Sequence, residues 1–136
     1  MGDRATIRIK QQYNDTAIHF YTHWSGSQVD QILAKALLDA DAAGRITDEA
    51  YCTRIIFDAL TGLEGGSTGY GIIIGDECRP FDVGHHSPSV EWEVRKHDSD
   101  SSEPRVQYMD FDGNFTGLSA WKDWARRILR NDLTAV

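Results

Sequence analysis

The sequence lacks several features that would assign it to a broad class at once. Its 136 residues contain only two cysteines, Cys52 and Cys78, which are too few for a disulfide framework and show no Cys-x-x-Cys metal spacing. No apolar run is long enough to span a membrane. The first ten residues are polar and lack the apolar segment of a signal peptide. We therefore expect a soluble cytoplasmic protein with reduced thiols and no membrane contact.

Positive charge is also scarce, with 14 Lys and Arg against 21 Asp and Glu and a formal net charge of -7. An acidic surface repels a phosphate backbone, so non-specific nucleic-acid binding is disfavoured. A locally basic pocket can still hold a small anion. The length and the 40% apolar fraction are ordinary for one globular domain, which we expect to cover residues 1–136.

Hydrophobic periodicity predicts the order β-β-α-α-β-β-β-α, an α+β fold. We expect one antiparallel sheet with the helices packed on one face. Caps at Ser27 and Thr47, together with Gly44 and Gly62, bound the first two helices. The expected strands are 5–10, 17–24, 71–75, 89–97 and 105–111, and the last expected helix is 118–131.

The second expected strand carries two different faces. His19, Tyr21 and His23 share one face, while Phe20 and Trp24 face the opposite, core side. The first face can line a ligand site, and its two histidines can act as acid and base on one substrate. Equally, it can be the solvent-facing side of a hairpin.

Two arginines give a second candidate for ligand binding. Arg4 and Arg8 share a strand face with Thr6, and two guanidinium groups in line can clamp a phosphate or carboxylate. The alternative is that they pair with acids at the surface.

A glycine-rich loop, GGSTGYG, follows the second expected helix. Its backbone amides can contact a phosphate, its hydroxyl groups can hydrogen-bond a ligand and its tyrosine can stack on one. It lacks the Gly-Lys-Ser/Thr of a P-loop, and a flexible connection is the alternative. The candidate ligand residues here are Gly65, Gly66, Ser67, Thr68 and Tyr70.

Metal binding has little support in the sequence. His85 and His86 lie together in a loop, but their spacing matches no zinc motif, and whether they approach His23 is open. The DFDGN segment lacks the later ligands of a calcium loop. Cys52 is expected to be an inert core thiol. We expect no metal and no cofactor.

The segments MGDRA and YTHWSG resemble an uncharacterised family of small phage, prophage and bacterial proteins. Its members open with a Met-Gly-Asn/Asp-Arg-Ala strand, followed by a strand that ends in His-Trp-Asn/Ser-Gly. The resemblance implies a phage context, in which small proteins act on host machinery or host defence in the host cytoplasm. It implies no reaction. The matching positions are Gly2, Arg4, Ala5, Tyr21, His23, Trp24 and Gly26.

Three functions remain open at this point. The first is binding and sequestration of a nucleotide-derived small molecule, which would counteract host defence signalling. The second is a nucleotide phosphodiesterase or lyase that uses His19 and His23. The third is an interaction module that inhibits a host enzyme through the acidic loop at 98–104. A homo-oligomer is compatible with each of them.

Overall fold

The fold is taken from a computed structural model, which describes residues 2–12, 16–62, 68–75, 87–92, 102–110 and 112–134, with side chains up to Arg130. The elements in chain order are β1 (Ala5–Lys10), β2 (Ile18–Thr22), η1 (Gly26–Gln28), α1 (Val29–Ala42), α2 (Glu49–Thr61), β3 (Tyr70–Ile74), β4 (Ser87–Trp92), β5 (Pro104–Met109), β6 (Phe115–Ala120) and α3 (Trp121–Thr134).

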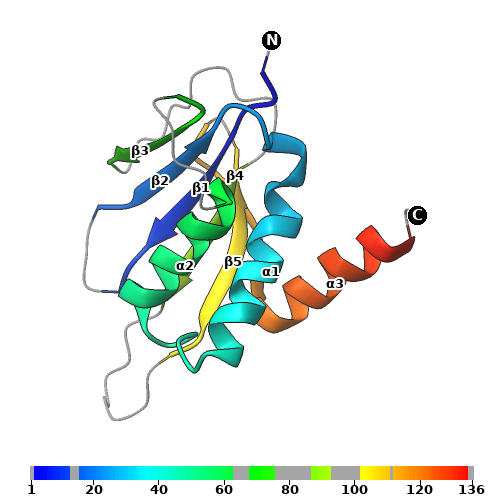
Figure 1. The fold of residues 1–136 in the computed structure, drawn as a ribbon. Helices are drawn as coiled ribbons and strands as arrows, with labels where there is room; N and C mark the ends of the chain where they lie inside the picture. The colour runs from blue at the N-terminus through cyan, green and yellow to red at the C-terminus, as the bar shows by residue number, and fades with distance from the viewer. Residues whose placement is uncertain are drawn as a thin grey trace.

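The expected α+β class and the order of the elements are confirmed, but the expectation of a purely antiparallel sheet is wrong and one strand was missed. The sheet has six strands in the order β3-β2-β1-β4-β5-β6 (Figure 1). Four of its pairings are antiparallel, but β1 and β4 run parallel, so the sheet is mixed. The sixth strand, β6, follows the predicted turn and occupies residues 115–117, which the sequence pattern assigned to no element, and 118–120, which it assigned to the start of the last helix.

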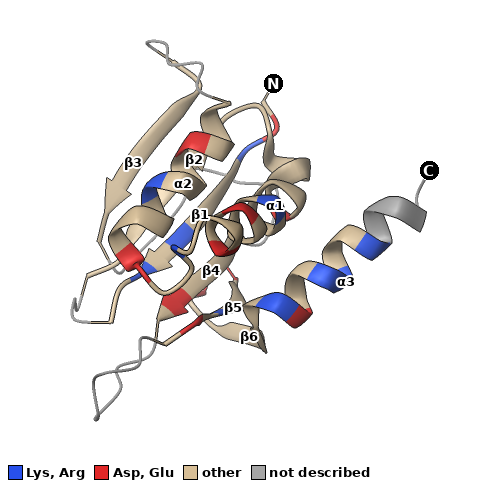
Figure 2. Ribbon diagram, turned by 60° about the horizontal axis from the view of Figure 1, so that its bottom comes forward, with Lys and Arg blue, Asp and Glu red and all other residues tan. Residues whose placement is uncertain are grey.

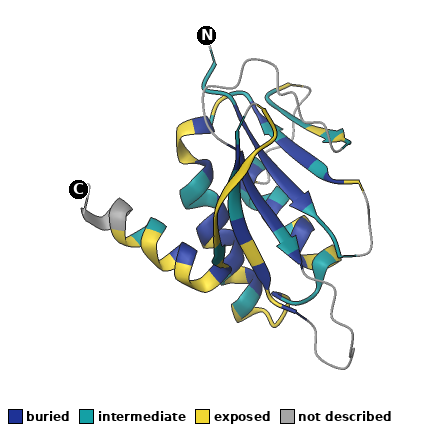
Figure 3. Ribbon diagram, turned by 180° about the vertical axis from the view of Figure 1, so that it is seen from behind, coloured by how far each residue is buried: buried dark blue, intermediate teal, exposed yellow. Residues whose placement is uncertain are grey.

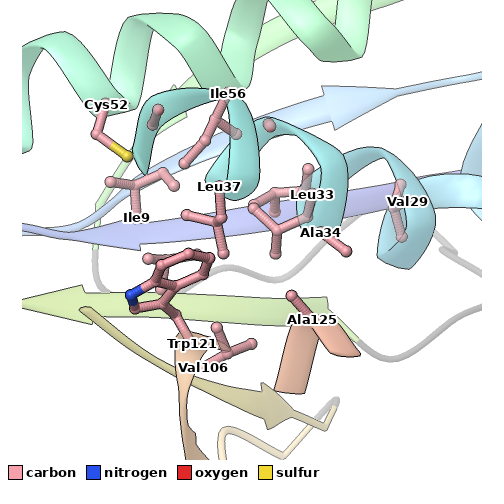
Figure 4. Packing of buried hydrophobic residues seen from close by; sticks show 14 of the residues in the cluster. Ile9, Val29, Leu33, Ala34, Leu37, Cys52, Ile56, Val106, Trp121 and Ala125 are labelled. Atoms are coloured by element: carbon pink, nitrogen blue, oxygen red, sulfur yellow. The ribbon is translucent and has the colours of Figure 1, made fainter. Parts of the chain in front are cut away.

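The three helices pack on one face of the sheet around a single apolar cluster (Figure 4). Ile7 and Ile9 of β1 and Val90 and Trp92 of β4 point into this cluster, as their alternation predicts. Leu33 and the other apolar residues of α1 pack over them at helical spacing. Burial of these side chains is the main stabilising term of the fold.

The helix α2 begins one residue later than expected. Asp48 rather than Thr47 is its N-cap, because the Asp48 carboxylate accepts a hydrogen bond from the backbone N–H of Tyr51. Gly62 ends the helix in the left-handed conformation with φ of 62°, as expected for a C-cap glycine.

The helix α3 extends from the end of β6 along α1 and away from the sheet (Figure 1). Trp121, Trp124 and Ala125 are buried, as the helical pattern predicts. Leu118 was expected in the same core face, but it lies in β6 and is 54% exposed. Figure 2 shows basic residues spaced along α3, although the whole chain is acidic, and Lys122, Arg126, Arg127 and Arg130 are all exposed.

None of the helices in the described part of the chain is both long and apolar enough to cross a membrane.

Candidate functional site

The face of the sheet opposite the helices contains a group of buried polar side chains on its three central strands. We call this group the buried polar layer. Figure 3 views this face, with β6 crossing in front of the central strands. All five members are less than one tenth exposed: Thr6 and Arg8 of β1, His19 of β2, and Ser87 and Ser89 of β4.

The strand register explains why these five residues meet. Arg8 is paired with His19 on one side and with Ser89 on the other. Two residues earlier, Thr6 is beside Ser87, and their hydroxyl oxygens lie 2.6 Å apart. Because side chains alternate along each strand, these pairs all point to the same face.

Arg8 is the charged member of the layer, and it is only 7% exposed. Its guanidinium donates one hydrogen bond to the hydroxyl of Ser89 at 3.0 Å and lies 4.9 Å from the ring centre of Phe115 on β6. Its Nε is buried and has no hydrogen-bond partner among the described residues. No carboxylate in the described part of the chain forms an ion pair with Arg8.

A buried guanidinium without an opposite charge is costly, because burial removes its hydration and no ion pair replaces that interaction. The ring of Phe115 and the hydroxyl of Ser89 compensate only part of this cost. The arrangement therefore has a donor group that suits an anionic oxygen, with several hydroxyl groups around it.

His19 belongs to the same layer and is fully buried. Its Nε2 lies 2.7 Å from the carbonyl oxygen of Gly75, a distance at which the nitrogen donates its proton to that oxygen. The two neighbouring histidines therefore occupy different surroundings: His19 is inside the layer, and His23 is part-exposed just beyond the end of β2.

The rings of Tyr21, His23 and Trp24 lie together at the end of β2, and we call them the ring group. The hydroxyl of Tyr21 lies 2.9 Å from Nδ1 of His23. The indole of Trp24 meets the imidazole edge to face, with ring centres 4.3 Å apart. Trp24 was expected in the core, but it is 59% exposed. The strand ends at Thr22, whose hydroxyl accepts the N–H of Ser25, so the alternation stops before Trp24.

The residues that carry the family resemblance converge at this same end of the sheet. The backbone N–H of Asp3 donates to the carbonyl of His23, and the N–H of Gly26 donates to the carbonyl of Asp3, both at 2.7 Å. The carboxylate of Asp3 also accepts the backbone N–H and the hydroxyl of Ser27. We call residues 2–4 and 23–27 the N-terminal junction.

Both glycines of the N-terminal junction stand where a side chain would collide. An added Cβ at Gly2 would lie 2.5 Å from Nε2 of His23. One at Gly26 would lie 2.7 Å from the carbonyl oxygen of Asp3 and 2.8 Å from that of Arg4. Close backbone approach therefore explains the two glycines of the motif without any ligand.

The remaining predicted ligand residues are spread more widely. Arg4 is part-exposed at the start of β1, and Thr68 is exposed just before β3. Tyr70 of β3 packs against the apolar cluster instead of standing open to solvent. The predictions for Gly65, Gly66, Ser67, His85 and His86 fall outside the described residues.

The structure adds residues to the candidate site that the sequence pattern did not indicate. Ser87, Ser89 and Phe115 reach Arg8 only through the pairing of distant strands. One sequence signal existed for the serines, because they alternate with the core residues Val90 and Trp92 and so share the polar face of β4. For Phe115 there was none, since β6 shows no alternation.

Two other titratable groups show how burial acts in this fold. Burial, followed by the charge of Asp48, raises the pKa of Cys52 to about 12, in agreement with an inert core thiol. Burial and then the charge of Asp30 raise the pKa of Tyr108 to about 12. Within the described residues, no group of three His, Cys, Asp or Glu side chains is arranged to hold a metal ion.

Comparison of the chain with protein-family models, with curated proteins and with solved structures found no match. The resemblance to the phage and prophage family therefore remains a prediction.

Proposed function

We propose that this protein binds a small anionic molecule, of which a nucleotide is the simplest form, and that Arg8 receives its anionic group. The observation that carries the proposal is the burial of Arg8 to 7% exposure without a carboxylate in the described part of the chain. A phosphate or carboxylate oxygen would supply the missing opposite charge and accept the unused Nε–H.

The ring group at the end of β2 supports a ligand that also contains an aromatic base. Trp24 is a large exposed indole held edge to face against His23, and Tyr21 is hydrogen-bonded to the same histidine. Exposed aromatic rings stack on bases of any sequence. His19, the neighbour of Arg8, and His23 are four positions apart in the sequence, which corresponds to roughly 13 Å of extended chain. A ligand that contacts both ends would have the length of a nucleotide with an extended phosphate portion.

The test is isothermal titration calorimetry against three sets of ligands: cyclic nucleotides and ADP-ribose, the matching nucleosides without phosphate, and inorganic phosphate. We expect binding by phosphate-bearing molecules and none by the nucleosides. Replacement of the guanidinium in Arg8→Gln should weaken binding about tenfold to a hundredfold, since a hydrogen bond to a charged group contributes about 1.5–3 kcal/mol.

Arg126→Gln is the matched control, because it removes one exposed arginine from α3 and leaves the buried polar layer untouched. It should bind as the unchanged protein does. If Arg8→Gln folds and binds every ligand as tightly as the Arg126 variant, then Arg8 does not receive the anion. If no phosphate-bearing molecule binds at all, the proposal of a nucleotide ligand is wrong.

The ring group contributes a separate prediction. Trp24→Ala should leave the fold intact, because the indole is 59% exposed, and should weaken the binding of base-containing ligands about fivefold or more. Its affinity for inorganic phosphate should not change. If Trp24→Ala lost affinity equally for base-containing ligands and for inorganic phosphate in the same titrations, Trp24 would support the fold of the site instead of stacking on a base.

The enzyme and inhibitor hypotheses remain weaker proposals. An acid–base pair needs both histidines at one substrate, whereas His19 is buried against the Gly75 carbonyl and His23 lies at the strand end. Recovery of the intact nucleotide from the protein after incubation separates binding from turnover. The phage context and the counteraction of host defence are part of the proposal only through the resemblance of the N-terminal motif.

A further inference from the structure

The two strands at the ends of the sheet are built differently. The pairing of β6 with β5 changes register between Val106 and Tyr108, and Gly117 has φ of 76°. Such irregularities keep an edge strand from pairing with another chain. The opposite end strand, β3, is paired with β2 in unbroken register from Ile74 to Tyr70. It contains neither proline nor a charged residue.

The backbone of β3 alternates between the sheet and its outer edge. The N–H of His23 donates to the carbonyl of Gly69, and the N–H of Gly75 donates to the carbonyl of Ala17. In an antiparallel pair every second residue bonds to its neighbour strand, so residues 69, 71, 73 and 75 face β2. The N–H and C=O groups of Tyr70, Ile72 and Ile74 consequently point away from the sheet.

The same residues present apolar side chains. Ile72 is 55% exposed and Ile74 is 74% exposed, both on the face that carries the helices. No described segment pairs with the outer edge of β3. β-Branched residues favour strand pairing, and exposed apolar side chains beside an unpaired strand edge mark a site of association.

Charge indicates what kind of strand fits this edge. The chain has a formal net charge of -7, yet the segment from Gly65 to Gly75 has no charged residue. A charged partner strand would gain no ion pair along this edge. Two copies of β3 would meet without the repulsion that the acidic surface produces elsewhere.

We propose that β3 pairs antiparallel with β3 of a second copy of this chain, around a two-fold axis at Ile72, and joins the two sheets into one. In this register Ile72 faces the partner's Ile72, and Tyr70 faces the partner's Ile74. All three outward-facing residues then form hydrogen-bonded pairs, which no other two-fold register of this strand achieves.

The other face of the joined strands is compatible with the same register. Ile73 comes opposite the partner's Gly71, where the missing side chain leaves room for the isoleucine. The proposal rests on the backbone and side chains of β3 and does not depend on Arg8 or on any ligand.

The experiment is sedimentation velocity over a range of protein concentrations. The unchanged protein should sediment with twice the chain mass of 15.3 kDa. Ile72→Lys and Ile72→Glu should each be monomeric, because each would place two like charges together at the axis. An equimolar mixture of the two variants should restore the dimer. Leu118→Lys is the control on β6: Leu118 is 54% exposed, and this variant should remain dimeric.

Ile72 is exposed, so the variants should keep the circular dichroism spectrum and melting temperature of the fold. A dimer that persists in Ile72→Lys overturns the proposal, and so does a mixture that stays monomeric. A monomeric unchanged protein at all concentrations would assign the open edge to a strand of another protein and would also overturn it.

Discussion

Arg8 and Trp24 stand in surroundings opposite to those that their residue types usually occupy. The charged side chain is 7% exposed and the large aromatic one is 59% exposed. A buried charge that no carboxylate of the described residues neutralises and an exposed indole both reduce the stability that the same chain would have with ordinary residues there. Arg8 lies in β1, and Trp24 lies just after the end of the neighbouring strand β2, which focuses the search for a ligand on this part of the molecule.

The two glycines of the N-terminal junction are also explained by the atoms immediately around them. Gly26→Ala should lower the free energy of unfolding by about 2 kcal/mol. The new methyl group would lie 2.7 Å from the backbone oxygen of Asp3, which cannot move aside as the end of a flexible side chain can. Gly62→Ala is the comparison: it meets nothing within 4 Å and should cost only the left-handed strain, about 1 kcal/mol.

Urea denaturation of the two alanine variants measures this difference. A Gly26→Ala protein as stable as the unchanged one would mean that the close approach of β1 and the 3₁₀ turn η1 is relaxed in solution. The glycine of the motif would then need another explanation, such as contact with a ligand.

At the scale of elements, α3 is tied to the rest of the fold by a short chain of hydrogen bonds. The indole N–H of Trp124 donates to the hydroxyl of Tyr108, which donates to the carboxylate of Asp30. Three elements, α3, β5 and α1, meet in this chain. Because the proton of the partly buried Tyr108 hydroxyl is donated to a carboxylate, the anchor depends on the protonation of the tyrosine.

This anchor gives a pH prediction. The pKa of Tyr108 rises from its ordinary 10.0 to about 12 in the folded protein, so the folded state holds the proton more tightly than the unfolded state. The stabilisation is complete below about pH 10 and is lost as the pH rises toward 12. Tyr108→Phe should be less stable by about 1–2 kcal/mol at neutral pH and should lack this alkaline loss.

The measurement is the free energy of unfolding of both proteins from pH 8 to 11.5. The difference between them should shrink above pH 10. Cys52 is present in both, so its own alkaline loss cancels in the comparison. A difference that stays constant to pH 11.5 would show that the Tyr108 proton is no more tightly held in the folded protein.

The element that sequence reasoning missed is β6. Its residues are nearly all exposed and include Gly117, so neither alternation nor helical spacing marks the segment. The sequence pattern therefore predicts that the last helix begins at Leu118, whereas α3 begins at Trp121. Strands with strong alternation, such as β1, were placed correctly because one of their faces packs into the apolar cluster and the other carries polar side chains.

At the scale of the whole molecule, the sequence predicted the class and the order of the elements but not the partners of each strand. The parallel pairing of β1 with β4 joins segments about 80 residues apart, and local patterns carry no information on such pairs. The same pairing brings Ser87 and Ser89 to Thr6 and Arg8. The sequence could therefore indicate Arg8, Tyr21 and His23 as candidates, but not the buried polar layer around Arg8.

The central claim is that Arg8 is kept buried for an anionic ligand and not for stability. The most direct measurement is the free energy of unfolding of Arg8→Met without ligand, compared with Arg126→Met. An apolar side chain of similar length should remove a buried charge that no described carboxylate neutralises and raise stability by about 1–3 kcal/mol, while the stabilisation by nucleotides disappears. Arg126→Met should change neither quantity appreciably. A ligand-free Arg8→Met protein that is less stable than the unchanged one would contradict the claim and would make Arg8 a structural residue of the sheet.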